Sequence, residues 1–100
     1  MARLASGIKP QNRIDDYLDY VHRQWSGIPA LAAEWAQWDE HSKLAFALDW
    51  PICEDRLEQL RKWADEGAMN AAQWLRYQEL LKLVAKYRSL LDKLLNQEAA

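Results

Sequence analysis

Helix-breaking and strand-favouring residues are scarce in this chain. Its 100 residues include three glycines and three prolines, and valine and threonine are nearly absent. Alanine, leucine, glutamate, lysine, glutamine and arginine dominate instead, and these residues favour helices over strands. The composition therefore predicts an all-α protein.

The chain also lacks the residues for a disulfide framework or a membrane span. Cys53 is the single cysteine, which excludes an internal disulfide and a cysteine-rich zinc site. No apolar run approaches the roughly 20 residues that cross a bilayer. Near the start, Gly7, Lys9 and Pro10 interrupt any secretory signal. We expect a cytoplasmic protein with one helical domain over residues 1–100, of which 1–11 form a flexible tail.

Charge is almost balanced overall but unevenly distributed. The net charge of −2 argues against the phosphate attraction that dominates nonspecific nucleic-acid binding. Residues 26–69 hold four basic and nine acidic side chains, whereas residues 70–100 hold five basic and three acidic ones. The last segment should therefore prefer an acidic neighbour, and the preceding segment can supply it within the fold.

The glycines and prolines divide the chain into four predicted helices. We expect the first to run from Asn12, with Asp15 completing a capping box, to about Trp25. Gly27 should end it in the left-handed conformation of a helix C-cap. The second helix is expected over about 29–49 without a break, although Asp39 could instead cap a fresh helix where the apolar pattern lapses.

Pro51 is predicted to separate the second helix from the third. The residue before a proline is pushed out of the α region, so Trp50 should end one helix, and Pro51 suits the first turn of the next. Gly67 should close this third helix. Its expected buried stripe consists of Ile52, Cys53, Leu57, Leu60, Trp63 and Ala64.

The fourth predicted helix, from the cap pair Asn70 and Gln73 to about residue 95, has the widest apolar arc. It carries two stripes at heptad spacing, one of them interrupted by Arg88. They are Trp74, Tyr77, Leu81, Val84, Leu91 and Leu95, and Leu80, Leu83, Tyr87, Leu90 and Leu94. The short loop 66–69 should make the last two helices antiparallel. We therefore expect a small four-helix bundle whose long C-terminal helix forms an antiparallel hairpin with helix three.

This arc should exceed what the rest of the chain can cover. A helix of about 25 residues is roughly 37 Å long, and the third helix offers about two-thirds of that length, so the last leucines should overhang. Six tryptophans add large, rigid surfaces that suit protein interfaces. The predicted partner interface is Trp74, Tyr77, Leu80, Leu83, Tyr87, Leu90, Leu91, Leu94 and Leu95. The alternative is that the aromatic residues fill the core of a monomer.

These features indicate a non-catalytic protein–protein interaction module without a cofactor. It would be a homodimer joined along the last helix, or the small subunit of a larger complex, such as an adaptor or an antitoxin-like protein. The alternative is a nucleic-acid-associated helical regulator that uses Lys82, Lys86 and Lys93.

A small enzyme or a metal-binding helical protein is less favoured. Asp19 and His22 could share a ligand face, but they make only an imperfect half of a helical di-metal motif. His41 lies among Asp39, Glu40 and Ser42 and could meet His22 or Cys53 only through the fold, so both histidines are expected at the surface. Cys53 would lie in the first turn of a helix, where thiolates are stabilised. The neighbouring acidic residues, Glu54 and Asp55, raise rather than lower the pKa of its thiol.

Overall fold

The computed structural model describes the backbone of residues 10–99 and the side chains of residues 12–96. Its elements are α1 (Pro10–Ser26), α2 (Ile28–Glu34), the short 3-10 helix η2 (Trp35–Gln37), α3 (Glu40–Asp65) and α4 (Ala71–Ala99). Residues 10–99 contain no strand, which confirms the all-α class. Most of the predicted tail lies outside the described residues, but residues 10 and 11 belong to α1.

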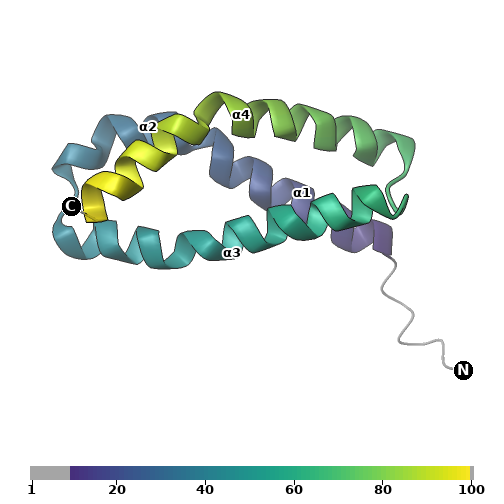
Figure 1. Ribbon diagram of the computed structural model, residues 1–100, viewed down its shortest axis with the longest axis horizontal. Coiled ribbons are helices and arrows are strands. Elements are labelled where there is room, and N and C mark those ends of the chain that lie inside the picture. The colour runs from purple at the N-terminus through teal and green to yellow at the C-terminus, as the bar shows by residue number, and fades with distance from the viewer. Residues whose placement is uncertain (1–9, 100) are drawn as a thin grey trace, which may run out of the picture.

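Three helical arms make up the fold, and the first of them is bent (Figure 1). α1 and α2 form the bent arm, while α3 and α4 run in opposite directions as expected. The bent arm packs against both: α1 contacts α3 and α4, and α2 contacts α4, whereas α3 and α4 share few contacts. The structure is thus not the expected four-helix bundle with a close hairpin. It is elongated, with dimensions of 52 × 27 × 18 Å.

The bend in the first arm occurs at Gly27 without a left-handed residue. The φ angle of Gly27 is −84°, so the expected left-handed cap is wrong. Its amide donates to the carbonyl of Arg23 at 3.3 Å, and its carbonyl accepts from the amide of Leu31 at 3.0 Å. Helical hydrogen bonding therefore continues across the bend. The start of α1 also differs from the prediction, because the helix begins at Pro10 rather than after an Asn12 cap.

The break between the bent arm and α3 lies at Asp39. The carboxylate of Asp39 accepts a hydrogen bond from the amide of Ser42 at 2.7 Å, which is the N-cap interaction. An extended Trp38, with a ψ angle of 144°, leads into this cap. The alternative of a fresh helix at Asp39 is therefore correct, and the single helix over 29–49 is wrong.

α3 continues through Pro51, contrary to the predicted break. A proline inside a helix removes one backbone hydrogen bond and crowds the preceding turn. The preceding residue, Trp50, is buried, and its ring centroid lies 5.2 Å from that of Trp25 and 5.5 Å from that of Phe46. Burial of aromatic side chains is worth more than one lost hydrogen bond. Tertiary packing therefore overrides the local preference.

Both predicted signals of the α3–α4 connection are confirmed. Gly67 has a φ angle of +74°, and the amide of Ala68 donates to the carbonyl of Trp63 at 2.9 Å, which is the pattern of a Schellman cap. Asn70 and Gln73 exchange hydrogen bonds: each backbone amide donates to the other's side-chain oxygen, at 3.0 and 2.8 Å. This reciprocal cap starts α4.

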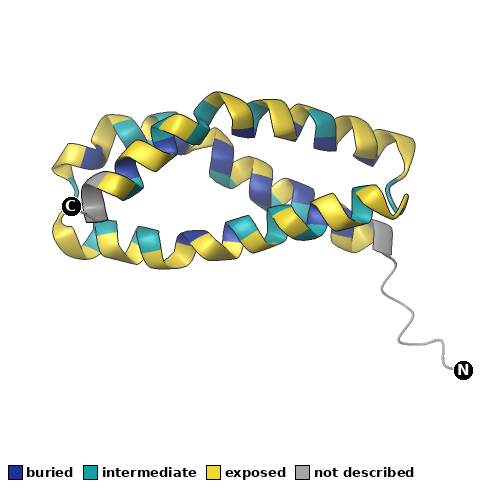
Figure 2. Ribbon diagram, viewed as in Figure 1, coloured by how far each residue is buried: buried dark blue, intermediate teal, exposed yellow. Residues whose placement is uncertain are grey.

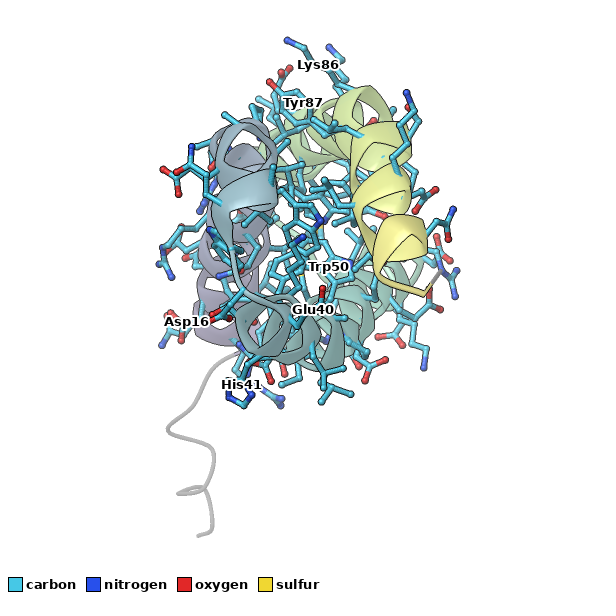
Figure 3. All side chains as sticks on the ribbon, turned by 90° about the vertical axis from the view of Figure 1, so that its left-hand side faces the viewer. Asp16, Glu40, His41, Trp50, Lys86 and Tyr87 are labelled. Carbon is cyan, nitrogen blue, oxygen red and sulfur yellow. The ribbon has the colours of Figure 1, made fainter. Side chains whose placement is uncertain are left out.

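The core lies along the faces that the three arms turn toward one another (Figure 2). Three of the six tryptophans, Trp25, Trp35 and Trp50, are buried in it, and Trp38 and Trp63 are half-buried. In the end-on view of Figure 3, Trp50 points into the space between the arms. Filling the core thus accounts for Trp25, Trp50 and Trp63, and Trp35 packs against Trp38 and Phe46.

Replacing Pro51 with alanine tests whether α3 is one helix. The substitution Pro51→Ala restores a backbone donor in mid-helix, so the free energy of unfolding should rise by about 1–3 kcal/mol, as measured by chemical denaturation. Pro29, in the first turn of α2, is the matched control, and Pro29→Ala should give no such gain. An unchanged or lower stability of Pro51→Ala would mean that a helix begins at this proline.

Candidate protein-interaction surface

The C-terminal half of α4 is covered by the chain itself. Leu91 and Leu94 are buried, and Leu90 and Leu95 are half-buried. The predicted overhang of these leucines is therefore wrong. Because α3 passes through Pro51, it has 26 residues against 29 in α4, and α2 packs on α4 as well. The prediction assumed that a shorter third helix, starting at Pro51, would be the main element packed against the last helix.

The remaining residues of the predicted interface differ in how far their side chains are exposed. Tyr77 and Leu80 are buried in the core, and Leu83 and Tyr87 are half-buried. Trp74 alone among the predicted interface residues is exposed. The intramolecular core thus occupies much of the surface that the sequence assigned to a partner.

A smaller apolar surface remains open on the N-terminal half of α4, and we call it the α4 patch. Its residues are Trp74, Leu75 and Leu81, whose exposed fractions are 46%, 66% and 37%. Trp74 and Leu81 are seven residues apart and therefore lie on one side of the helix, two turns from each other. Leu75 falls outside both heptad stripes, which is why the sequence pattern did not select it.

Basic side chains accompany the α4 patch on the outside of the helix. Lys82, Lys86 and Lys93 are exposed, and Lys82 follows Leu75 by seven residues. The ammonium of Lys82 lies 3.4 Å from the carboxylate of Glu79, an exposed pair of little energetic weight. The surface around the α4 patch is therefore apolar, with exposed lysines and the exposed carboxylate of Glu79 beside it.

A second apolar surface, the α3 patch, lies on the outside of α3. It consists of Leu44, Leu48 and Ile52, with exposed fractions of 50%, 68% and 48%. The three residues follow one another at intervals of four and so form a continuous row along the helix. The sequence placed Ile52 in the buried stripe of the third helix, and this placement is wrong. The helical phase fixed by the buried Trp50, Cys53 and Leu60 turns Ile52 toward the outside.

An open groove adjoins the α3 patch. It has a volume of about 520 Å³, and its lining includes Trp38, Ala45, Phe46 and Asp49. Ala45 precedes Leu48 by three residues, so the groove and the patch meet on one side of α3. Both surfaces have acidic borders, because Glu40, Asp49 and Asp55 are exposed.

An ion pair between Glu54 and Arg88 joins α3 to α4. The guanidinium of Arg88 donates to the two carboxylate oxygens of Glu54 at 2.6 and 3.3 Å, and the Trp50 indole N–H donates to the same carboxylate at 2.7 Å. Burial raises the pKa of Glu54, but these hydrogen bonds outweigh burial and leave the pKa below its ordinary value of 4.5. Arg88 also lies over the ring of Trp25, 4.8 Å from its centroid. The break that Arg88 makes in the heptad stripe is thus a structural contact.

The candidate chemical groups are not gathered into a site. Burial, followed by the charge of Glu54, raises the pKa of the Cys53 thiol to about 12, and the side chain is buried. His22 and His41 are exposed on different arms. The described residues contain no group of three or more His, Cys, Asp or Glu side chains that could hold a metal ion. No helix in residues 10–99 has the length and apolar character to cross a membrane.

Comparisons with known proteins identify no relative. No family model matches the sequence, and neither the curated proteins nor the solved structures give a match. The surface of the chain itself is therefore the source of functional inference.

The Glu54–Arg88 pair should make stability depend on pH. Because the folded pKa of Glu54 is lowered, its charge stabilises the fold above the ordinary carboxyl pKa, and this contribution disappears as pH falls through the folded value. Glu54→Gln should lower the free energy of unfolding by on the order of 1 kcal/mol at pH 7 and by much less at pH 3. Denaturation at both values measures this change. Glu34→Gln, at an exposed carboxylate, is the control, and an equal loss at both pH values would contradict the account.

The Cys53 thiol should resist modification in the folded protein. A raised pKa and burial remove both the reactive thiolate and access to it. An aromatic disulfide reagent at pH 8 should therefore react with Cys53 only after guanidinium unfolding, with Cys53→Ala as the blank. Rapid reaction without denaturant would show that the thiol is accessible.

Proposed function

We propose that this protein is a non-catalytic protein–protein interaction module, and that the α4 patch binds the partner. The observation that carries the proposal is the exposure of Trp74, Leu75 and Leu81 on one helix of an elongated fold. Fully burying one such side chain is worth roughly 1.5–3 kcal/mol. Tryptophan is also enriched among the residues that dominate binding energy. The partner is a second copy of the chain or the larger subunit of a complex.

The chemistry of the chain supports a binding role over catalysis. A buried thiol with a pKa of about 12 is a poor nucleophile. Its state also suits a reducing compartment such as the cytoplasm. The lysines of α4 would be the basis of nucleic-acid binding, but Lys82 is paired with Glu79 and the net charge of the chain is −2. A protein partner therefore fits the distribution of charge better than nucleic acid does.

Site-specific photocrosslinking tests the proposal. A photoreactive amino acid is placed at the position of Leu75 or of Leu81, in the full chain in its native host. Each position should give a discrete cross-linked protein product, because the bound partner covers it. Mass spectrometry of the product identifies the partner chain.

The same amino acid at Ala33, an exposed position on α2, provides the matched control. Cross-linking at Leu75 and Leu81 should exceed cross-linking at Ala33 by at least several-fold. Equal, diffuse labelling at all three positions would show that the α4 patch faces solvent in the cell and would overturn the proposed function.

A further inference from the structure

The exposed apolar surfaces of this chain form a pair with opposite surrounding charge. The α3 patch is bordered by carboxylates, and the α4 patch is accompanied by lysines. We propose that the α4 patch of one copy binds the α3 patch of a second copy, so that copies associate head to tail. This inference rests on the proposed function and names the partner.

No described side chain forms an ion pair with the carboxylates around the α3 patch. Among the described side chains, Glu40, Asp49 and Asp55 make no ion pair, although the basic residues of α3 are close in sequence. Arg61 is held by Glu58 and Asp65, and Arg56 lies over the ring of Tyr20, 4.4 Å from its centroid. Cations from another molecule would therefore meet free carboxylates.

Two of the three lysines of α4, Lys86 and Lys93, make no ion pair with a described side chain. Lys86 lies over the ring of its neighbour Tyr87, 5.4 Å from the centroid, and Lys93 makes no ion pair with a described side chain. Lys82 has only its exposed contact with Glu79. Lysines beside exposed leucines suit a surface with carboxylates beside leucines, because opposite charges at the rim favour the correct partner.

The lengths of the two patches also agree. The row from Leu44 to Ile52 covers eight residue steps, about 12 Å of helix, and the interval from Trp74 to Leu81 covers seven steps, about 10 Å. Each patch thus presents about two helical turns of apolar surface. One helix packed on another over this length can cover all six side chains.

Charge selects head-to-tail pairing over symmetrical pairing. Two α3 patches facing each other would bring carboxylates together, and two α4 patches would bring lysines together. The patches lie on the outer sides of different arms, and α3 and α4 form opposite edges of the molecule in Figure 1, so one copy cannot join its own two patches. A contact between two different surfaces builds rings or open chains of copies rather than closed two-fold dimers.

The contact should be weak, because its area is small. A pair of two-turn helix faces falls below about 1,200 Å², the lower limit of standard stable interfaces. Association should therefore depend on protein concentration, and it should weaken as salt screens the charges at the rim.

Two complementary variants test the proposal. Leu48→Glu disables the α3 patch, and Leu75→Glu disables the α4 patch. These are the most exposed residues of their patches, so both variants should fold, and circular dichroism checks this. Sedimentation equilibrium over a range of concentrations should show that wild type associates, whereas each variant alone stays at the monomer mass of 11.7 kDa.

An equimolar mixture of the two variants gives the decisive measurement. Leu48→Glu retains its α4 patch and Leu75→Glu retains its α3 patch, so the mixture should form a one-to-one dimer of twice the monomer mass that grows no further. Ala33→Glu should behave as wild type.

A second pair of variants, Asp55→Lys and Lys82→Glu, tests the charges beside the patches, because both substitutions reverse a charge at an exposed position. Each charge variant alone should associate at least several-fold more weakly than wild type, and an equimolar mixture of the two should associate again.

The outcomes separate this inference from the proposed function. Wild type that stays monomeric at every concentration overturns the inference, and so does a mixture that stays monomeric. Association that survives Leu48→Glu but not Leu75→Glu also overturns it, and points to symmetrical pairing through α4. In each of these cases the proposed function still stands if photocrosslinking at Leu75 captures a partner.

Discussion

One contact joins all three arms, and the rest of the fold depends on it. Trp25 ends the core face of α1 with its ring fully buried, and that ring meets Trp50 of α3 on one side and the guanidinium of Arg88 of α4 on the other. Glu54 then binds both Arg88 and Trp50. The indole N–H of Trp25 has no hydrogen-bond partner among the described residues, which costs about 1–3 kcal/mol. Burial of the indole ring outweighs this cost.

The sequence allowed prediction of those features that a few neighbouring residues determine. The all-α class, the glycine cap at Gly67 and the reciprocal cap of Asn70 and Gln73 follow from backbone chemistry within one helical turn, and the structure has each of them. Pro51 shows the limit of such reasoning. Its local preference favours a break, but the packing of Trp50 against a residue 25 positions earlier keeps α3 continuous. Only the tertiary structure contains that contact.

The candidate surface was less predictable than the fold for the same reason. Apolar periodicity identifies the face of α4 that must be buried, but it does not tell whether the chain or a partner buries it. A continuous α3 and the bent arm cover Leu91 and Leu94. Leu75 is left open and lies outside both heptad stripes, whereas Trp74 and Leu81 are left open although they belong to one of them.

The placement of large apolar side chains then presents a physical contrast. This chain buries three of its six tryptophans, two of them at one contact, yet it leaves six large apolar residues on the outer faces of two arms. Single exposed leucines are ordinary on protein surfaces and need no explanation. The row of Leu44, Leu48 and Ile52 is different, because adjacent exposed residues form one surface whose removal from water is favourable as a unit. In a thin molecule of three arms every helix has an outer face that no other arm covers. A helix of another molecule can pack against such a face and bury its apolar side chains. The carboxylates beside the α3 patch and the lysines beside the α4 patch favour a cover of opposite charge in each case.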